Sequence, residues 1–254
     1  MVNVLICGAL GKMGQAVANE LKIKKGIKVA AGFDIKLSEN LSYPVYDNFE
    51  NIKEQIDIVI DFSNPLALDS ILDFGLKNNV PLVLCTTGYS NNDKIKIKKA
   101  AKSIPIFYSQ NMSIGVNLIT QLVKKTALIL SDEFDIEIIE KHHNQKLDAP
   151  SGTALMLADA VTSVRDNTKY IYDRHCVRKK RDKNDIGIHS IRCGNIVGEH
   201  EVIFASDDEI IEISHKAMSK KIFAKGAVNA AGFLLNKPAG IYNMSDMLKQ
   251  HNCI

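Results

Sequence analysis

The residues most capable of chemistry lie together in the middle of the chain, in the stretch Glu140–Thr153. This stretch contains two adjacent histidines, His142 and His143, followed by Lys146. An imidazole changes charge near neutral pH and can deliver a proton, while an ammonium group can pair with a carboxylate or steady a charged intermediate. If a strand continues through the pair, the two histidines project to opposite faces, so that one can deliver a proton while the other binds or supports. These residue types suit a hydride transfer that is accompanied by a proton.

A carboxylate-binding site is predicted directly after this pair. Pro150 disfavours helix for the residue before it, and Ser151 is a typical N-cap for the apolar helical pattern that follows. Ser151, Gly152 and Thr153 therefore offer backbone N–H groups, hydroxyls and the positive end of a helix to an anion. A solvated surface loop is the alternative interpretation. No metal site is expected, because adjacent histidines do not readily share one ion and no cysteine or acidic cluster completes a ligand set.

A glycine-rich motif near the N-terminus predicts a second binding site. It stands between an apolar strand pattern at residues 2–7 and a helical pattern. Glycines in this context permit a tight turn and let backbone N–H groups approach a pyrophosphate at the helix N-terminus. The alternative is a plain strand-to-helix turn, but strand, helix and a later acid stand in register and favour dinucleotide binding. The candidate residues of this loop are Gly8, Gly11, Lys12, Met13 and Gly14.

The choice of dinucleotide depends on the residues after the second predicted strand. Asp34 stands where a carboxylate can accept hydrogen bonds from the adenosine ribose, which favours an unphosphorylated ribose. Lys36 could neutralise a 2′-phosphate, although an ordinary solvated lysine is the alternative. NADH, NADPH or both therefore remain open.

Two further loops are expected at the same edge of the sheet. Ligands of open parallel sheets bind beyond the carboxyl ends of the strands, and small hydroxyl and amide residues there can hold a nicotinamide and its ribose. Loop capping by Thr and Asn is the alternative. The candidates after the fourth and fifth predicted strands are Cys85, Thr86, Thr87, Ser109, Gln110, Asn111 and Met112.

The elements that must position these loops follow from hydrophobic periodicity. Up to residue 112, short apolar runs alternate with helical patterns, which is typical of a parallel sheet covered on both faces. A helical pattern at 116–130 is followed by a strand pattern at 135–140. Three later strand patterns are consecutive, with no helical pattern between them, which predicts an α+β domain with a mixed or antiparallel sheet. A final helical pattern at 223–235 can return to the first domain. The predicted domains are 1–112 with 222–254 for the dinucleotide, and 113–221 for the substrate.

Composition limits the partners of the protein. The 254 residues suit one large or two modest domains, and the formal charge of +3, from 32 basic and 29 acidic residues, is too even to indicate nucleic acid or a membrane surface. The basic run at 178–183 lacks interleaved aromatic residues and is interpreted as a solvated loop. Five scattered cysteines without metal spacing fit reduced thiols. No leader is evident and no apolar run approaches the ~18 residues that span a bilayer, so an unprocessed cytoplasmic protein is expected.

The stretch Glu140–Thr153, which reads Glu-Lys-His-His-Asn-Gln-Lys-Leu-Asp-Ala-Pro-Ser-Gly-Thr, resembles the signature of the dihydrodipicolinate reductase family. The resemblance extends along the chain through Gly8–Gly14, Ser109–Gly115 and Gly194–Glu201. It implies a Rossmann-type domain, a second domain whose sheet builds a homotetramer, and NADH or NADPH as cofactor. The implied reaction reduces a cyclic dicarboxylate, 4-hydroxy-tetrahydrodipicolinate, to tetrahydrodipicolinate in diaminopimelate and lysine biosynthesis.

The resemblance also implies roles for individual residues. His142 resembles the family's proton donor and Lys146 its catalytic partner. The residues that resemble the family's contacts to the substrate carboxylates are His143, Gly152 and Thr153.

Three positions depart from the family pattern. Cys85 stands where the family often has Gly, and Gln110 stands where Ala is common. Ile35 stands where an Arg often meets the 2′-phosphate, which weakens any preference for NADPH. Two alternatives remain. One is another two-domain NAD(P)-dependent amino- or hydroxy-acid dehydrogenase, which leaves the His-His-x-x-Lys loop unexplained. The other is a non-catalytic NAD-sensing protein, which would need a DNA-binding helix pair or a partner surface.

Overall fold

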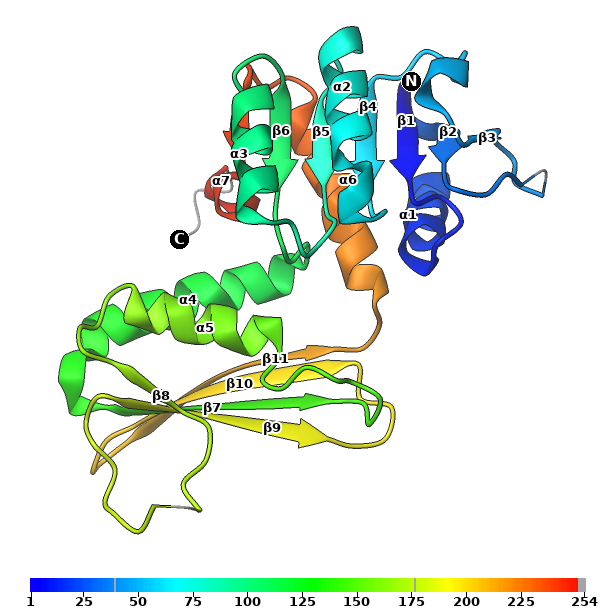
Figure 1. Ribbon diagram of the computed structural model, residues 1–254. Coiled ribbons are helices and arrows are strands. Elements are labelled where there is room, and N and C mark those ends of the chain that lie inside the picture. The colour runs from blue at the N-terminus through cyan, green and yellow to red at the C-terminus, as the bar shows by residue number, and fades with distance from the viewer. Residues whose placement is uncertain (39, 176, 251–254) are drawn as a thin grey trace. The chain divides into compact units, whose positions relative to one another are not determined.

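The computed structural model describes residues 1–38, 40–175 and 177–250 (Figure 1). The chain divides into two compact units, one formed by Met1–Ile114 together with the described residues from Lys221 onward, the other by Gly115–Lys220. Each unit has its own sheet and its own hydrophobic core. Cys176, in the predicted second domain, and residues 251–254, in the predicted first domain, lie outside the described residues.

The first unit contains a seven-stranded parallel sheet with the strand order β12-β6-β5-β4-β1-β2-β3. The strand order reverses beside β1, which pairs with β2 on one side and with β4 on the other. Ligands of open parallel sheets bind at such a reversal, beyond the carboxyl ends of the strands. The strands are β1 (Val2–Cys7), β2 (Ile27–Phe33), β3 (Val45–Tyr46), β4 (Ile58–Asp61), β5 (Leu82–Leu84), β6 (Pro105–Tyr108) and β12 (Gly240–Tyr242).

Helices cover both faces of this sheet (Figure 1). Strand β1 shows why, because its side chains alternate between two cores: Val4 and Ile6 pack in one, Leu5 and Cys7 in the other. The first core also takes up α1 (Lys12–Ile23), α6 (Lys221–Leu234) and α7 (Met244–Lys249), and the second takes up α2 (Leu68–Asn78) and α3 (Asn91–Ala100). Short 3₁₀ turns lie at η1 (Phe49–Asn51) and η2 (Pro65–Ala67) in this unit, and at η3 (Ser131–Glu133) in the second unit.

The second unit is built on a five-stranded mixed sheet with the order β11-β10-β7-β9-β8. Strand β7 runs antiparallel to β10 and parallel to β9. The helices α4 and α5 pack on one face of this sheet, and its core includes Ile138, Leu157 and Phe204 (Figure 1). The elements are α4 (Ile114–Leu130), β7 (Asp135–His142), α5 (Gly152–Thr162), β8 (Lys169–Ile171), β9 (Asp185–Arg192), β10 (Gly198–Ala205) and β11 (Ile210–Ala217).

The predicted fold class, a Rossmann-type parallel sheet plus an α+β domain with a mixed sheet, is confirmed. The sequence did not predict β3, β8, β12, α3 or α7. Strands of two or three residues are too short to show a period, and α3 is largely polar, with only Ile97 and Ala100 buried. Among the described helices, none is long and apolar enough to cross a membrane.

Candidate active site

The end of β7 carries the most unusual side chain of the second unit, the carboxylate of Glu140. Alternate residues of β7 face the helices, and Glu140 and His142 continue the row of Ile136 and Ile138. Glu140 is fully buried and His142 is 8% exposed. A carboxylate is almost never buried in this way unless every oxygen is paired.

Both oxygens of Glu140 are fully engaged. Arg192, at the end of β9, donates Nη2 to Oε1 and Nη1 to Oε2, each at 2.8 Å. The backbone N of Ser151 donates to Oε1 at 3.1 Å, and His142 Nδ1 lies 2.6 Å from Oε2. Burial by itself would raise the pKa of Glu140, but hydrogen bonds from Arg192 and His142 outweigh it and lower the pKa to about 2. Glu140 is therefore an anion at every physiological pH.

His142 is held from two sides. Its ring meets the ring of His200, on β10, edge to face with the centroids 5.1 Å apart. Burial lowers the pKa of His142, while Glu140 acts in the opposite direction and the positive charges of Lys146 and Arg192 lower it further. The imidazole is thus sensitive to every charge near it.

The predicted partner residues begin in the loop after β7. Lys146 donates its backbone N to the carbonyl of His143 at 3.1 Å, which turns the loop, and its Nζ lies 2.7 Å from Asp148 Oδ1. His143 lies outside the strand and is half-buried. Lys146 thus lies near enough to His142 for its positive charge to lower the pKa of the imidazole. The described contacts include no direct hydrogen bond between the two side chains.

The predicted anion site follows at the start of α5. Ser151 is the N-cap, as predicted, and its Oγ accepts from the backbone N of Ala154 at 3.2 Å. Gly152 is exposed and Thr153 is half-buried. Because Ser151 also donates its own N to Glu140, the helix start is tied directly to the carboxylate behind His142.

His200 is a buried imidazole that the sequence did not indicate as a site residue. Its Nε2 lies 3.0 Å from Ser151 Oγ, and burial lowers its pKa to about 4. A group whose folded pKa lies below its unfolded value of 6.5 takes up its proton first in the unfolded chain. His200 therefore makes the fold less stable as the pH falls from about 6.5 to about 4.

We expect His200→Gln to flatten the acid side of the stability profile. Between neutral pH and pH 4, the wild-type protein should lose up to about 3 kcal/mol more unfolding free energy than the variant. Urea unfolding followed by circular dichroism at a series of pH values measures the difference. The exposed His175, changed to Gln, serves as the control. Parallel profiles for wild type and His200→Gln would show that burial of this imidazole has no such cost.

In the first unit, the glycine loop joins β1 to α1 and is built without room for side chains. Gly8 has a φ of +76°, and a Cβ there would lie 2.7 Å from the carbonyl oxygen of Phe62. A Cβ on Gly14 would overlap the carbonyl oxygen of Gly8. Gly11 is the N-cap of α1, and no described side chain caps that helix. Uncapped N–H groups above a tight glycine turn fit the pyrophosphate of a dinucleotide.

Asp34 lies close to this loop. Its Oδ2 accepts from the backbone N of Leu10 at 2.9 Å, and its Oδ1 accepts from the N of Ile35 at 2.8 Å. Ile35 and Lys36 are both exposed beyond it. The carboxylate thus connects the end of β2 to the glycine loop at the strand-order reversal.

The loops after β5 and β6 begin at the carboxyl ends of the strands, as the glycine loop does. Cys85 and Thr86 are buried, whereas Thr87 is exposed. Ser109 Oγ donates to the carbonyl of Asn111 at 2.9 Å, and so folds this loop back on itself. Gln110 is exposed and Met112 is buried; a Cβ on Gly226 of α6 would overlap the carbonyl oxygen of Met112.

A buried carboxylate that the sequence did not indicate, Asp61, organises these loops. It ends β4 and is fully buried. Its Oδ1 accepts from the N of Ser63 at 2.9 Å and its Oδ2 from the hydroxyl of Tyr89 at 3.0 Å. Burial raises the pKa of Asp61, against the effect of its hydrogen bonds from Ser63, Thr86 and Tyr89. The signal available in the sequence was an acid at the end of an apolar strand.

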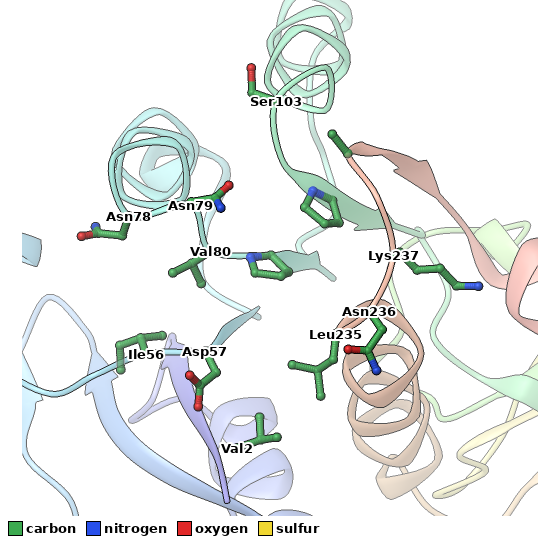
Figure 2. A pocket seen from close by; sticks show the side chains of 13 residues that line it. Val2, Ile56, Asp57, Asn78, Asn79, Val80, Ser103, Leu235, Asn236 and Lys237 are labelled. Atoms are coloured by element: carbon green, nitrogen blue, oxygen red, sulfur yellow. The ribbon is translucent and has the colours of Figure 1, made fainter.

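A groove of about 660 Å³ opens at the amino ends of the strands of the parallel sheet (Figure 2). Its walls include Val2 and Pro105, which begin β1 and β6, Pro81, which directly precedes β5, and Leu235 after α6. Its carboxylate, Asp57, already accepts from the backbone N of Asn3 at 2.7 Å. The groove therefore lies at the amino ends of the strands, away from the glycine loop.

The sequence missed the supporting residues of the second unit, Glu140, Arg192 and His200. Glu140 stood two residues before His142 on an alternating strand, which placed both side chains on one face. Arg192 and His200 lie 50 or more residues further along the chain, and only strand pairing brings them to β7. Among the residues that the structure describes, no cluster of three or more His, Cys, Asp or Glu side chains is placed to hold a metal ion.

The glycine loop at a strand-order reversal and the buried carboxylate–histidine pair define a two-domain NAD(P)H-dependent oxidoreductase. Two family models match the chain: dihydrodipicolinate reductase, N-terminus, at residues 2–112, and dihydrodipicolinate reductase, C-terminus, at residues 115–248. The chain belongs to the dihydrodipicolinate reductase family.

Relatives of nearly the same length agree with these matches. A protein from Clostridium novyi (strain NT) is 47% identical over 253 residues, which cover 99% of this chain and 100% of the relative. One from Clostridium tetani (strain Massachusetts / E88) is 48% identical over 249 residues, which cover 98% and 97%. Both are named 4-hydroxy-tetrahydrodipicolinate reductase. A different amino- or hydroxy-acid dehydrogenase and a non-catalytic NAD sensor are therefore set aside.

Solved structures show the same family and a wider fold group. Dihydrodipicolinate reductase from Paenisporosarcina sp. TG-14, solved with dipicolinate bound, is similar with a TM-score of 0.80 and 25% identity, covering 96% of this chain and 97% of that one. Myo-inositol 2-dehydrogenase from Lactobacillus plantarum has a TM-score of 0.62 at 11% identity, covering 98% and 93%. The second likeness concerns the fold alone.

Proposed function

We propose that this chain reduces 4-hydroxy-tetrahydrodipicolinate to tetrahydrodipicolinate with NADH or NADPH, on the route to diaminopimelate and lysine. The substrate, the reduced nicotinamide and a proton give the product, the oxidised nicotinamide and water. The observation that carries the proposal is the buried pair of Glu140 and His142 at the end of β7, close to Lys146 and to the start of α5. This arrangement offers a proton donor beside groups that suit carboxylates.

In this proposal the two domains divide the work. Residues 1–112 with 222–254 bind the dinucleotide, and residues 113–221 bind the substrate. Gly8, Gly11 and Gly14 let the backbone approach the pyrophosphate, and the loops after β5 and β6 hold the nicotinamide end. A bound nicotinamide supplies the hydride.

The remaining steps belong to side chains of the second unit. His142 gives a proton to the carbon next to the one that is reduced. Lys146 pairs with a substrate carboxylate or steadies negative charge as it develops. His143, Gly152 and Thr153 hold the substrate carboxylates, and Gly152 and Thr153 do so at the N-terminus of α5. The dipicolinate in the Paenisporosarcina protein is a planar ring with two carboxylates, the chemical class that such a site would take.

A coupled assay tests the proposal. Dihydrodipicolinate synthase, pyruvate and aspartate semialdehyde generate the substrate in place, and the absorbance of the reduced nicotinamide is followed after the chain is added. We expect consumption that depends on both the synthase and the chain. Consumption that proceeds equally without the synthase, or none with either cofactor, would refute the proposed reaction.

We expect Asp34→Ala to weaken the binding of NADH by about tenfold and that of NADPH by less. The carboxylate suits a free 2′-hydroxyl and disfavours a 2′-phosphate. Because Asp34 also supports Leu10, both cofactors should lose some affinity, so the difference between them is the readout. Fluorescence titration of each cofactor measures it, with Asp34→Asn as a control that keeps an acceptor. Equal losses would rule out the ribose contact.

We also propose that the protein works in the cytoplasm, because reduced nicotinamides are supplied there, and that it assembles as a homotetramer. The face of the five-stranded sheet away from α4 and α5 carries Ile139, Ile191 and Ile203, and Ile191 is 42% exposed. Across the strands these isoleucines pair with Glu201, Lys141 and Glu137, so the open face mixes apolar and charged side chains, a composition that suits burial against another copy of the chain. Light scattering coupled to gel filtration should give the mass of four chains, and a monomer mass at micromolar concentration would contradict it.

A further inference from the structure

The strongest unexplained feature of the second unit is the buried anion behind His142. Glu140 has no contact with solvent, yet it accepts hydrogen bonds from His142, Ser151 and both terminal nitrogens of Arg192. Burying a charge is costly unless it is fully paired, so this arrangement is expected where it serves a purpose that an apolar residue could not.

The hydrogen bonds to Glu140 determine the tautomer of His142. An ionised carboxylate can only accept hydrogen bonds, and all the sites on Glu140 that could take a proton are filled by donors. The 2.6 Å contact between His142 Nδ1 and Glu140 Oε2 therefore requires that Nδ1 carries a hydrogen. The neutral ring then has its lone pair on Nε2.

The other ring nitrogen of His142, Nε2, lies beside Gly198. Among the described residues, none forms a hydrogen bond with His142 Nε2. Gly198 begins β10 beside this atom, and a Cβ there would lie 3.0 Å from Nε2. Nδ1 is thus held by Glu140, and Nε2 is the ring nitrogen without a hydrogen-bond partner among the described residues.

We infer that Glu140 is a positioning residue, oriented by Arg192, which fixes the hydrogen of His142 on Nδ1 and makes Nε2 the atom that gains and loses the catalytic proton. The inference rests on the proposed function for the identity of the reaction, but the assignment of the tautomer does not. Arg192 holds the plane of the carboxylate with two parallel hydrogen bonds, a geometry that a lysine could not reproduce. The backbone N of Ser151, at the start of α5, donates to the same carboxylate. Glu140 therefore contacts both the proton donor, His142, and the anion site.

The charges that face His142 determine the sign of the effect on pH dependence. They are Glu140 on its own strand, Arg192 on β9, Lys146 in the following loop and the imidazole of His200 on β10. Glu140 is the one that raises the pKa of His142 against the effect of burial, while Lys146 and Arg192 lower it. Removing the charge of Glu140 should therefore lower the pKa of His142 and leave fewer rings protonated at neutral pH.

The direct test is nitrogen NMR of the imidazole in the full-length protein labelled on histidine. In the wild type we expect the His142 signals of a neutral ring with hydrogen on Nδ1, and in Glu140→Gln a shift towards the other tautomer. A wild-type ring with its hydrogen on Nε2 would overturn the inference, whatever the enzyme's activity and whether or not any variant folds.

Kinetics supply the second test. Glu140→Gln should lower kcat by about 10- to 100-fold with a small change in KM, and should move the alkaline limb of the kcat profile, where His142 loses its proton, to lower pH. The matched control is Glu137→Gln on the same strand, whose carboxylate also pairs with an imidazole, His189 at 2.7 Å, and an arginine, Arg174 at 2.8 Å. The control should keep the wild-type pH limb. A variant that loses stability but keeps both the tautomer and the limb would reduce Glu140 to a structural role, even in an active reductase.

Discussion

His142→Gln lowers kcat by roughly 10²- to 10⁴-fold and leaves the affinity for the dinucleotide unchanged, if His142 delivers the proton. Glutamine fills much of the same space but cannot carry a proton between its nitrogen and a substrate carbon. The dinucleotide binds to the other unit in our proposal, so its affinity should not depend on this ring. Steady-state kinetics for kcat, combined with fluorescence titration of NADH, separate the two quantities.

The control for this variant is His175→Gln, since His175 is an exposed histidine of the same unit. It should retain wild-type turnover. Equal losses of turnover and cofactor affinity in His142→Gln would indicate a general disturbance of the fold. Turnover within a few-fold of wild type would remove His142 from the role of proton donor, and Lys146 would become the residue to test next.

Gly14→Ala should abolish measurable dinucleotide binding and lower the unfolding free energy by about 1 to 3 kcal/mol. The added methyl would overlap the carbonyl oxygen of Gly8 and lie 2.9 Å from the Cα of Ala9. Backbone atoms cannot move aside as a flexible side chain can. Relief of the overlap must move α1 away from the loop and separate the N–H groups that would meet the pyrophosphate. Cofactor titration and urea unfolding measure the two losses.

Gly232→Ala is the matched control, a glycine-to-alanine change in α6 of the same unit. Among the described atoms, none lies within 4 Å of a Cβ built at this position. Alanine in a helix interior is favoured over glycine by roughly 0.5 to 1 kcal/mol, so this variant should be as stable as wild type or slightly more so, with unchanged cofactor affinity. Wild-type cofactor binding by Gly14→Ala would show that the tight packing of this loop does not serve the dinucleotide.

Local pattern in the sequence was enough to predict the fold class. β1 was predicted at its observed bounds because an apolar run before a glycine turn has few other interpretations. The Ser151 cap and the start of α5 were predicted for a similar reason, since capping depends on residues within one turn. The glycine loop and the loop from His142 to Thr153 were located because their chemistry is carried by neighbours in the chain.

Tertiary structure alone decided what surrounds those residues. Arg192 reaches Glu140 because β9 pairs with β7, and His200 reaches His142 and Ser151 because β10 pairs with its other side. Strand order and register depend on the packing of whole faces, which the local spacing of residues does not encode. Burial, and with it the charge state of Glu140 and His142, depends on the same packing. The sequence by itself determined which groups can do chemistry, and the pairing of strands distant in the chain decided how they are held and charged.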